Sequence, residues 1–326
     1  MSKDKEGPFA SLNDVEPQTV EWLMKPLIPY GMITIMEGDP GIGKSYLAMH
    51  IASVVSTGGN LADSMKISRG RVLYMSAEDD AAYTIRPRID AMGGDVTRIR
   101  YQPNYVALDE EGLKALMHEI RTNPPSLIVI DPLYAYVPAG SDMYKPNVIR
   151  SLLSQLTEFA EYAGSAVLIV RHLTKSKSDK AIYQGVGSID VIGAARSAIL
   201  VAKHPDDPEV KVIAHVKYNL SEQGKSWQFE LVLEKDKTLP ILRWLGSTDL
   251  TPEDLLSTPN FDRPSALNEA IDFLRDYLVD GPESAEKVKT AASASSIASR
   301  TLDRAKDKIG VITKKQGKRW FWSLPD

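Results

Sequence analysis

The sequence has no cysteine in its 326 residues and only five histidines. Disulfide bonds and thiolate metal sites are therefore excluded, and the scattered histidines do not indicate a structural zinc site. Long apolar runs are also missing, since none approaches the length of a membrane span or of the apolar part of a signal peptide. We therefore expect a soluble, non-secreted, cytoplasmic protein that does not contact a membrane.

Acidic residues are in slight excess overall, but basic residues dominate the C-terminal end. The net charge is −4, which taken alone argues weakly against a nucleic-acid partner. Residues 284–326 contain ten Lys or Arg against four Asp or Glu, a net +6, so residues 1–283 carry −10. This basic segment favours a nucleic-acid partner. The hydrophobic fraction of 43% is typical of a globular chain with ample core.

A glycine-rich segment, MITIMEGDPGIGKS at residues 32–45, is the most informative part of the chain. Apolar β-prone residues lead into the glycines and helix-forming residues follow, which predicts a strand, a loop and a helix. The pattern GxxxxGKS is complete, so a chance glycine turn is the weaker interpretation. The residues expected to bind the phosphates of a nucleotide are Gly38, Asp39, Pro40, Gly41, Ile42, Gly43, Lys44, Ser45 and Tyr46.

Each residue type in this loop has a role in phosphate binding. The glycines let successive backbone N–H groups turn inward together. Lys44 is expected to place its ammonium against the β- and γ-phosphates, and Ser45 to offer its hydroxyl to Mg²⁺. The helix that starts at about Lys44 would direct its N-terminus at the anion. The sequence therefore predicts a bound nucleotide with Mg²⁺.

Strands and helices alternate after this loop. We expect strands within 69–80, 98–102, 125–133 and 165–172, separated by helices at 81–94, 109–125 and 148–164. This order predicts an α/β fold with a doubly wound or RecA-like parallel sheet, whose ligands lie beyond the carboxyl ends of the strands. Four more strands, at 197–203, 210–217, 226–234 and 240–244, are joined by short turns and predict antiparallel hairpins on one side.

Composition divides the chain into four parts. We expect a flexible tail at 1–14, an α/β domain at 15–245, a linker rich in Ser, Thr, Pro and Asp at 246–263, and a small domain at 264–326. Three predicted helices and a hairpin turning at Gln316-Gly317 give the small domain the order of a winged helix. Trp22 is expected to pack in the core or at a subunit contact, with stacking on a nucleobase as the alternative.

Acidic residues follow two of the predicted buried strands. Asp131 ends the apolar run LIVI, where a carboxylate can hold Mg²⁺ through water, although a helix cap or turn former is the alternative. We expect the strand before Glu78 to neighbour the strand before the glycine loop, so that Glu78 reaches the water that attacks the γ-phosphate. Asp79 and Asp80 are expected to cap the next helix, and capping by all three acids is the alternative.

Three basic or imidazole side chains complete the predicted site. His172, at the end of its strand, is expected to hydrogen-bond the γ-phosphate and relay its presence to the following loop, with a structural role as the alternative. Phosphoryl transfer also gains from a cation supplied by a neighbouring subunit. Arg196 and Lys217 are the candidates for that cation, and an ordinary surface role is the alternative for each.

Six segments together resemble the RepA-type RecA-like ATPases of plasmids and phages. They are GDPGIGKS, VLYMSAEDD, LIVIDPL, VLIVRHLTKS, GVGSIDVIGAARSAIL and HVKYN, and the resemblance extends from about Trp22 to Leu233 in order and spacing. It implies a ring of six copies, with ATP at the subunit junctions and single-stranded DNA in the central channel. The second lysine of partition-type P-loops is absent from the glycine loop, which argues against that branch.

The resemblance also assigns roles to individual residues. It implies that Glu78 is the catalytic glutamate, that His172 is the sensor, and that Arg196 is an arginine finger. Lys217 would be a second cation acting across the junction, and Asp131 would be the Walker B acid. Lys44 and Ser45 would bind the phosphates and Mg²⁺ of ATP.

Clustered cations mark two candidate DNA-binding regions. The first is the lysine-rich loop from Thr174 to Ser188, for which a solvated crossover is the alternative, and the loop from Tyr134 to Pro146 is a weaker candidate. The second is the small C-terminal domain, for which protein docking is the alternative. The residues expected to contact DNA are Lys175, Lys177, Lys180, Arg300, Arg304, Lys314, Lys315, Lys318 and Arg319.

The leading hypothesis is an ATP-driven ring motor on DNA, a RepA-like helicase with a winged helix for DNA or partner contact. A second hypothesis is a RadA-like recombination or repair ATPase that remodels nucleoprotein without unwinding. A third is a regulator in which ATP gates assembly and the small domain reads an operator, so that Glu78 is dispensable. A small-molecule kinase is disfavoured because nothing resembles a phosphoacceptor site.

Overall fold

The computed structural model describes residues 11–62, 65–138, 146–172, 192–235, 237–256, 266–279, 281–295, 297–317 and 319–325. Several predictions fall outside these residues: the lysine-rich loop with Lys175, Lys177 and Lys180, the wing residue Lys318, the first ten residues, and 257–263 of the expected linker.

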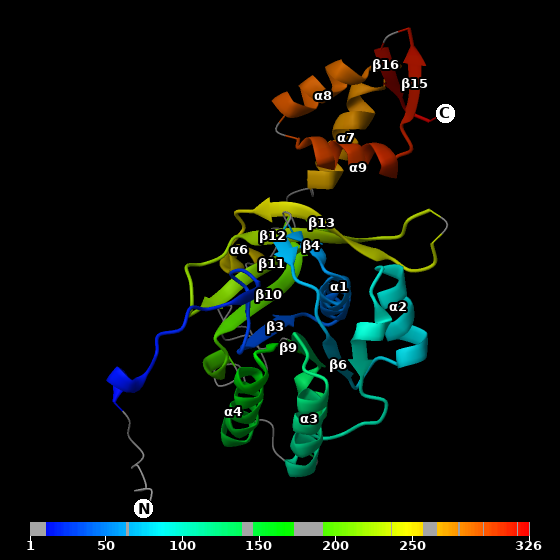
Figure 1. The fold of residues 1–326 in the computed structure, drawn as a ribbon. Helices are drawn as coiled ribbons and strands as arrows, with labels where there is room; N and C mark the ends of the chain where they lie inside the picture. The colour runs from blue at the N-terminus through cyan, green and yellow to red at the C-terminus, as the bar shows by residue number, and fades with distance from the viewer. Residues whose placement is uncertain are drawn as a thin grey trace, which may run out of the picture.

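The main sheet is built from the predicted strands. Its strands are β3 (Ile33–Gly38), β6 (Val72–Ser76), β7 (Ile99–Tyr101), β8 (Leu127–Asp131), β9 (Ala166–His172), β10 (Ser197–His204), β11 (Asp207–Tyr218), β12 (Ser226–Val232) and β13 (Ile241–Thr248). Within the described residues their order is β13-β12-β11-β10-β3-β9-β8-β6-β7 (Figure 1). Strands β10 to β7 are parallel and β11 to β13 antiparallel, which confirms a mainly parallel sheet with antiparallel hairpins on one side.

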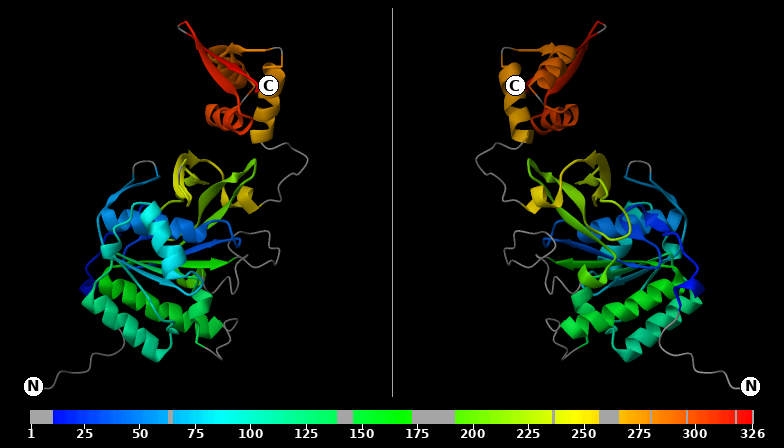
Figure 2. Two further views of the ribbon diagram at one scale, coloured as in Figure 1. Left: turned by 90° about the vertical axis from the view of Figure 1, so that its right-hand side faces the viewer. Right: turned by 90° about the vertical axis from the view of Figure 1, so that its left-hand side faces the viewer.

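Helices cover both faces of the parallel part of the sheet. Helices α1 (Lys44–Thr57) and α2 (Arg86–Ala91) lie on one face, and α3 (Glu110–Thr122) and α4 (Pro146–Ala163) on the other (Figures 1 and 2). Alternate strand residues therefore enter two separate cores. This explains why the parallel strands are continuous apolar runs, since a strand covered on both faces has no solvent side.

The order of the strands corrects one expectation. Strand β6, which precedes Glu78, does not neighbour β3, because β9 and β8 lie between them. The chain crosses from β3 to β6, continues outward to β7, and then returns through β8 and β9, so strands consecutive in sequence are separated in space. Glu78 nevertheless lies at the same edge as the glycine loop because all these strands run parallel.

Several short elements were not expected from the sequence. Strand β1 (Trp22–Met24) pairs with β2 (Ile28–Pro29), and β4 (Gly59–Leu61) pairs with β5 (Met65–Ile67). Strand β13 continues to Thr248, into the segment predicted as linker, and the short α6 (Pro252–Leu256) lies where the prediction allowed at most a helical turn. A short 3₁₀ helix, η1 (Leu12–Asp14), lies in the predicted tail.

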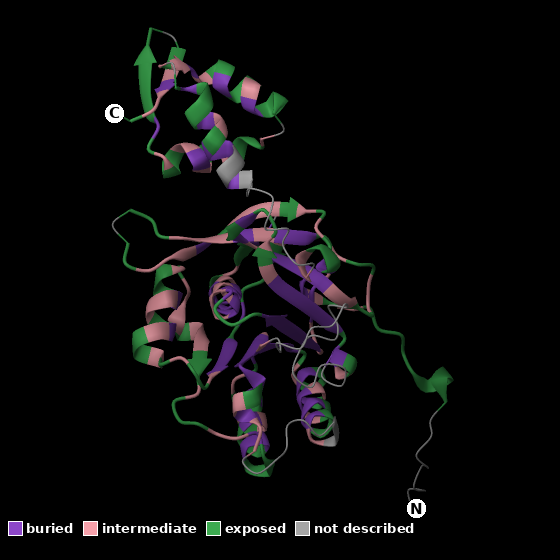
Figure 3. Cartoon of the chain, turned by 180° about the vertical axis from the view of Figure 1, so that it is seen from behind, coloured by how far each residue is buried: buried purple, intermediate pink, exposed green. Residues whose placement is uncertain are grey.

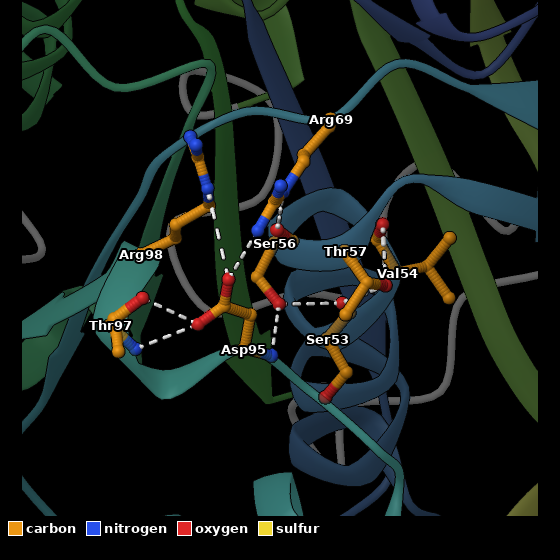
Figure 4. Close-up of polar contacts among 8 residues, drawn as sticks. All are labelled: Ser53, Val54, Ser56, Thr57, Arg69, Asp95, Thr97 and Arg98. Atoms are coloured by element: carbon orange, nitrogen blue, oxygen red, sulfur yellow. Dashed lines mark hydrogen bonds and ion pairs between the residues drawn. The ribbon is translucent and has the colours of Figure 1, made fainter.

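A polar network anchors the end of α1 to the turn before β7 (Figure 4). Ser56 Oγ accepts the N–H of Asp95 at 2.8 Å and donates to the Ser53 carbonyl at 2.7 Å. Asp95 caps η4 (Val96–Arg98) and pairs with Arg69 at 2.6 Å. The pKa of Asp95 is lowered, chiefly by hydrogen bonds from Thr97. The network holds α1, and with it the glycine loop at its other end, against the sheet.

The C-terminal segment forms a small unit with its own core. It contains α7 (Ala266–Tyr277), β14 (Glu283–Ser284), α8 (Ala285–Ala294), α9 (Ser299–Lys308), β15 (Ile312–Gln316) and β16 (Arg319–Ser323). The expected helices and hairpin are present, and β14 adds a third strand in the order β14-β16-β15. Leu274, Val288 and Trp322 are among its buried residues.

Burial differs between the main sheet and the outer strand of the small unit (Figure 3). Purple, buried segments fill the main sheet, whereas the outer strand β15 is exposed along its whole length.

Among the described helices, none combines the length and apolarity needed to cross a membrane.

Candidate nucleotide-binding site

The glycine loop adopts backbone conformations that its glycines allow. Gly41 and Gly43 have φ values of 73° and 102°, in the left-handed region that favours glycine. Gly38 is packed so closely that an added Cβ would lie 2.2 Å from the Val201 carbonyl oxygen. The loop ends at α1, so its backbone N–H groups and the start of the helix can face the same anion.

Lys44 is buried and its ammonium is held inside the loop. Its Nζ donates to the carbonyls of Gly38 at 2.8 Å and Asp39 at 2.7 Å, and lies 3.2 Å from His172 Nδ1. Burial lowers the pKa of Lys44 to about 8, opposed by the nearby carboxylates, of which Asp131 contributes most. A phosphate group at this position would replace the carbonyls as the partner of the ammonium.

Asp131 lies at the end of β8, directly opposite the start of α1. Its carboxylate accepts hydrogen bonds from the hydroxyls of Ser45 and Tyr74, the latter at 3.1 Å. Burial raises its pKa to about 6, and these two hydrogen bonds oppose the rise. A hydroxyl and a carboxylate are the hard oxygen ligands that Mg²⁺ prefers, and two protein ligands leave room for water and phosphate oxygens. Ser45 and Asp131 therefore fit Mg²⁺.

Glu78, Tyr134 and His172 meet at the carboxyl edge of the sheet. The Tyr134 hydroxyl donates to Glu78 Oε1, and His172 Nε2 lies 3.9 Å from Glu78 Oε2. The hydrogen bond to Glu78 raises the pKa of Tyr134 to about 12. The pKa of His172 is lowered, first by burial and then by Lys44. His172 thus lies between Lys44 and Glu78 and contacts both sides of the site.

Two of the predicted acids behave differently from each other. Asp80 caps the helical turn η3 (Ala81–Ile85), accepting from Ala82 and Tyr83, as expected. Asp79 does not cap it and pairs with Arg88 at 3.5 Å, which corrects the prediction. The reason is geometric, because only the residue directly before the helix has its side chain beside the free N–H groups.

Tyr46 lies beside the same basic residue. The Arg88 guanidinium stacks over the Tyr46 ring at 4.5 Å from its centroid, so one face of the predicted nucleotide contact is covered. Arg88 is placed by α2, and the sequence offered no spacing rule that would have paired it with Tyr46.

Four more residues of the site were missed by the sequence analysis. Tyr74 and Tyr134 supply the hydroxyls to Asp131 and Glu78, and no motif marks either tyrosine. Glu37 and Arg171 form a buried pair with 3.4 Å between Oε2 and Nε, on the α3 side of the sheet. Their positions directly before the glycine loop and before His172 were the available signal, since a charge within an apolar strand needs a partner.

Arg196 and Lys217 lie at the other end of the parallel strands. Arg196 directly precedes β10, whose first residue pairs with Thr34, whereas Gly38 pairs four residues further along β3. Four residues of strand correspond to about 13 Å. Lys217 is opposite Ala198 in the same edge region. The two cations therefore do not join the site of their own chain.

The environments of these two cations differ. Arg196 is exposed. Lys217 Nζ donates to the carbonyls of Ile192 at 2.6 Å and Gly193 at 2.9 Å. Burial lowers the pKa of Lys217, and the positive charge of Arg196 lowers it further.

The predicted DNA-binding residues of the C-terminal unit fall into two groups. Arg300 and Arg304 on α9 contact the main domain, where Arg300 Nη1 donates to the Leu245 carbonyl at 3.1 Å and Arg304 pairs with Asp207. The second group consists of Lys314, Lys315 and Arg319, which are exposed on the hairpin. Trp322 is buried and Trp320 is 51% exposed.

The fold and this site define the chain as a RecA-like P-loop ATPase. The family model described as AAA domain matches residues 5–178, more than half of the chain. The chain therefore belongs to the AAA domain family.

The chain is also similar to curated DNA repair proteins named RadA. It is 28% identical over 147 residues to that of Mycobacterium tuberculosis (strain CDC 1551 / Oshkosh), covering 44% of this chain and 28% of the relative. The RadA of Mycolicibacterium smegmatis is 30% identical over 151 residues, with 44% and 29% covered. For Bacillus subtilis (strain 168) the identity is 27% over 150 residues, with 45% and 29% covered. The chain thus spans less than a third of the length of these relatives.

Among solved structures, the chain resembles the one titled "ATPase Domain of G40P". The TM-score is 0.48 and the identity 12%, with 62% of this chain and 81% of that chain covered.

Proposed function

We propose that this protein hydrolyses ATP as a ring of six copies and couples hydrolysis to movement along, or unwinding of, DNA in the cytoplasm. The observation that carries the proposal is the convergence of Lys44, Asp131 and Glu78 at one edge of the sheet, with His172 in contact with Lys44. The family and the DNA repair relatives support an ATPase associated with DNA.

Each residue has a part in the proposed reaction. Lys44 and the loop N–H groups bind and orient the β- and γ-phosphates, while Ser45 and Asp131 would hold Mg²⁺, which would supply charge neutralisation to the phosphates. Glu78 orients the attacking water and accepts its proton, and Tyr134 fixes the position of the carboxylate. His172 exchanges its contact with Lys44 for one with the γ-phosphate.

The remaining predicted residues act between subunits or on DNA. Arg196 and Lys217 of one copy complete the site of the next, because they lie at the opposite edge in their own chain. Lys175, Lys177 and Lys180 contact single-stranded DNA in the ring. The C-terminal unit acts as a winged helix and contacts duplex DNA through its cations.

The test is the rate of ATP hydrolysis with and without single-stranded DNA. For wild type we expect hydrolysis that DNA stimulates, and for Glu78→Gln a loss of about 10²–10⁴-fold, the usual contribution of a general base. Glu110→Gln is the matched control, since Glu110 is an exposed glutamate on α3 that pairs only locally with Lys114. Absence of ATP hydrolysis under every DNA condition would contradict the proposal.

The likeness to RadA supports a second candidate, an ATPase of recombination or repair that does not unwind DNA. Strand displacement on a forked duplex separates the two candidates, because only a helicase releases the strand. Hydrolysis without release would favour the second candidate.

A further inference from the structure

The first half of α9 contacts the antiparallel side of the main domain through Arg300 and Arg304. Arg300, Thr301 and Arg304 are spaced so that they share one side of the helix. With His204 and Gln228 among the residues of the main sheet, they line a cavity of about 300 Å³. We refer to Arg300, Thr301 and Arg304 as the arginine face of α9.

Two carboxylates of the main domain occupy this arginine face. Arg304 approaches Asp207 with two guanidinium nitrogens, Nη1 to Oδ2 and Nη2 to Oδ1, the second at 3.3 Å. Glu230 lies 3.8 Å from Arg304 Nε and 3.7 Å from Arg300 Nη2. The Asp207 side chain is 9% exposed and that of Glu230 13%. Glu230 also pairs with Arg243 of the main domain, at 3.5 Å, so it shares its charge between the two units, whereas Asp207 pairs with Arg304 of α9.

The arrangement has the geometry of phosphate recognition. A guanidinium binds a carboxylate and a phosphate with the same planar pair of N–H donors. In a winged helix the third helix enters the groove of a duplex with its first residues leading, and those are the residues engaged here. Contact of this face with the main domain and with a duplex therefore exclude each other.

The other cations of the unit remain accessible at the same time. Lys315 lies over Trp320 at 5.7 Å, on a hairpin whose first strand is exposed throughout. Lys306 is partly exposed and lies over Trp322 at 5.1 Å, about half a turn around α9 from Arg304 by helical spacing. A duplex can thus meet the hairpin first and the arginine face only after the unit separates from the main sheet.

We propose that the arginine face of α9 is a phosphodiester-binding surface, and that Asp207 and Glu230 occupy it as phosphate substitutes until duplex DNA displaces them. The inference rests on the proposed function for the identity of the polyanion. The consequence is a C-terminal unit that is closed on the main domain without DNA and released from it by a duplex.

The experiment compares duplex binding by the full chain and by Asp207→Asn/Glu230→Gln, using fluorescence anisotropy of a labelled short duplex. Asn retains the side-chain oxygen that accepts the Glu209 N–H at 3.1 Å, so the local turn is preserved. We expect binding about tenfold tighter, the factor for a surface that is free in about one molecule in ten. The matched control is Asp206→Asn/Glu209→Gln, which removes the same charge from exposed neighbours.

A second measurement reports the closed state without DNA. Because the chain has no cysteine, Glu111→Cys and Asp307→Cys introduce two unique sites for spin labels, one on α3 and one on α9. We expect a narrow distance distribution for wild type and the control, and a broad one for Asp207→Asn/Glu230→Gln. If the double variant unfolds, Glu230→Gln alone replaces it in this measurement. This single variant leaves the Asp207 contact intact, so its distance distribution should broaden in the same way but less.

Three outcomes overturn the inference. Unchanged distances in the variant would mean that the carboxylates do not hold the unit. Released distances with unchanged duplex affinity would mean that the arginine face does not bind phosphates. Equal tightening by the control would assign the effect to net charge. Failure of the proposed function is seen separately as ATP hydrolysis that no DNA stimulates, a measurement that does not depend on Asp207 or Glu230.

Discussion

The two edges of the parallel sheet carry the proposed catalytic residues in contrasting environments. At the carboxyl edge Lys44 and Asp131 are buried, and Lys44, His172 and Glu78 form a continuous set of contacts. At the amino edge Arg196 is exposed and Lys217 is held by two backbone carbonyls. The carboxyl edge is therefore organised within one chain, whereas the described residues of the amino edge place no glycine loop beside its cations.

The two edges therefore have different proposed roles, nucleotide binding at the carboxyl edge and contact with another copy's nucleotide at the amino edge. Buried groups at the carboxyl edge have shifted pKa values, for Lys44 about 8 and for Asp131 about 6, because burial disfavours their charged forms. Such shifts are typical of sites that bind charged ligands. Cations at the amino edge can serve a phosphate only if another copy of the chain presents one.

The largest expected effect tests whether the two edges meet between copies. Arg196→Ala should lower DNA-stimulated ATP hydrolysis by about 10³-fold or more, the contribution of an arginine supplied by a neighbouring subunit. Arg71→Ala is the matched control, because Arg71 is also an exposed arginine directly before a parallel strand. Equal rates of ATP hydrolysis for the two variants would show that Arg196 does not act at the nucleotide site of another copy.

Mixing two inactive variants tests directly whether Lys44 and Arg196 act together between copies. Lys44→Ala and Arg196→Ala should each be inactive alone, and an equimolar mixture should recover part of the wild-type rate. Recovery is expected because some junctions pair an intact Lys44 from one variant with an intact Arg196 from the other. No recovery in mixed assemblies of confirmed composition would place both residues in the same chain's site.

A second prediction concerns the buried pair behind the carboxyl edge. Burial raises the pKa of Glu37 from 4.5 to about 7, although Arg171 opposes the rise. The folded protein therefore retains a proton that the unfolded chain has lost, and stability falls as the pH rises from about 4.5 to about 7. By linkage the fall is about 3 kcal/mol, and Glu37→Gln should remove it.

Urea unfolding at pH 5 and pH 8 measures this difference. The raised pKa of Asp131 adds a fall of the same sign below about pH 6, so the wild-type curve is read against that of Glu37→Gln. Glu110→Gln, at an exposed position, should follow wild type. A variant with the same pH dependence as wild type would show that Glu37 is charged in the folded state.

The smallest expected effect concerns a single hydrogen bond at the carboxyl edge. Tyr134→Phe removes the donor to Glu78 and should lower the rate of ATP hydrolysis about tenfold, since one hydrogen bond to a charged group contributes about 1.5 kcal/mol or more. Nucleotide affinity should change little because Lys44 is untouched. Tyr83→Phe, at a side chain 85% exposed, is the control, and equal rates for both variants would exclude a role for the Tyr134 hydroxyl.

Local sequence was sufficient for much of this protein. The glycine loop, the alternation of strands and helices, the acid at the end of β8 and the basic C-terminal segment are all read from neighbouring residues, because glycine content, periodicity and charge act over a few positions.

Only the tertiary structure decided which distant residues meet. The insertion of β9 and β8 between β3 and β6, the hydroxyls of Tyr74 and Tyr134 on the acids, and the pairing of Glu37 with Arg171 depend on how crossovers order the strands. The same holds for Arg300 and Arg304 of α9. The sequence predicted them as DNA contacts, and the structure pairs them with carboxylates of the main domain. Strand order and compensation of buried charge are properties of the whole packed chain, and no local pattern encodes them.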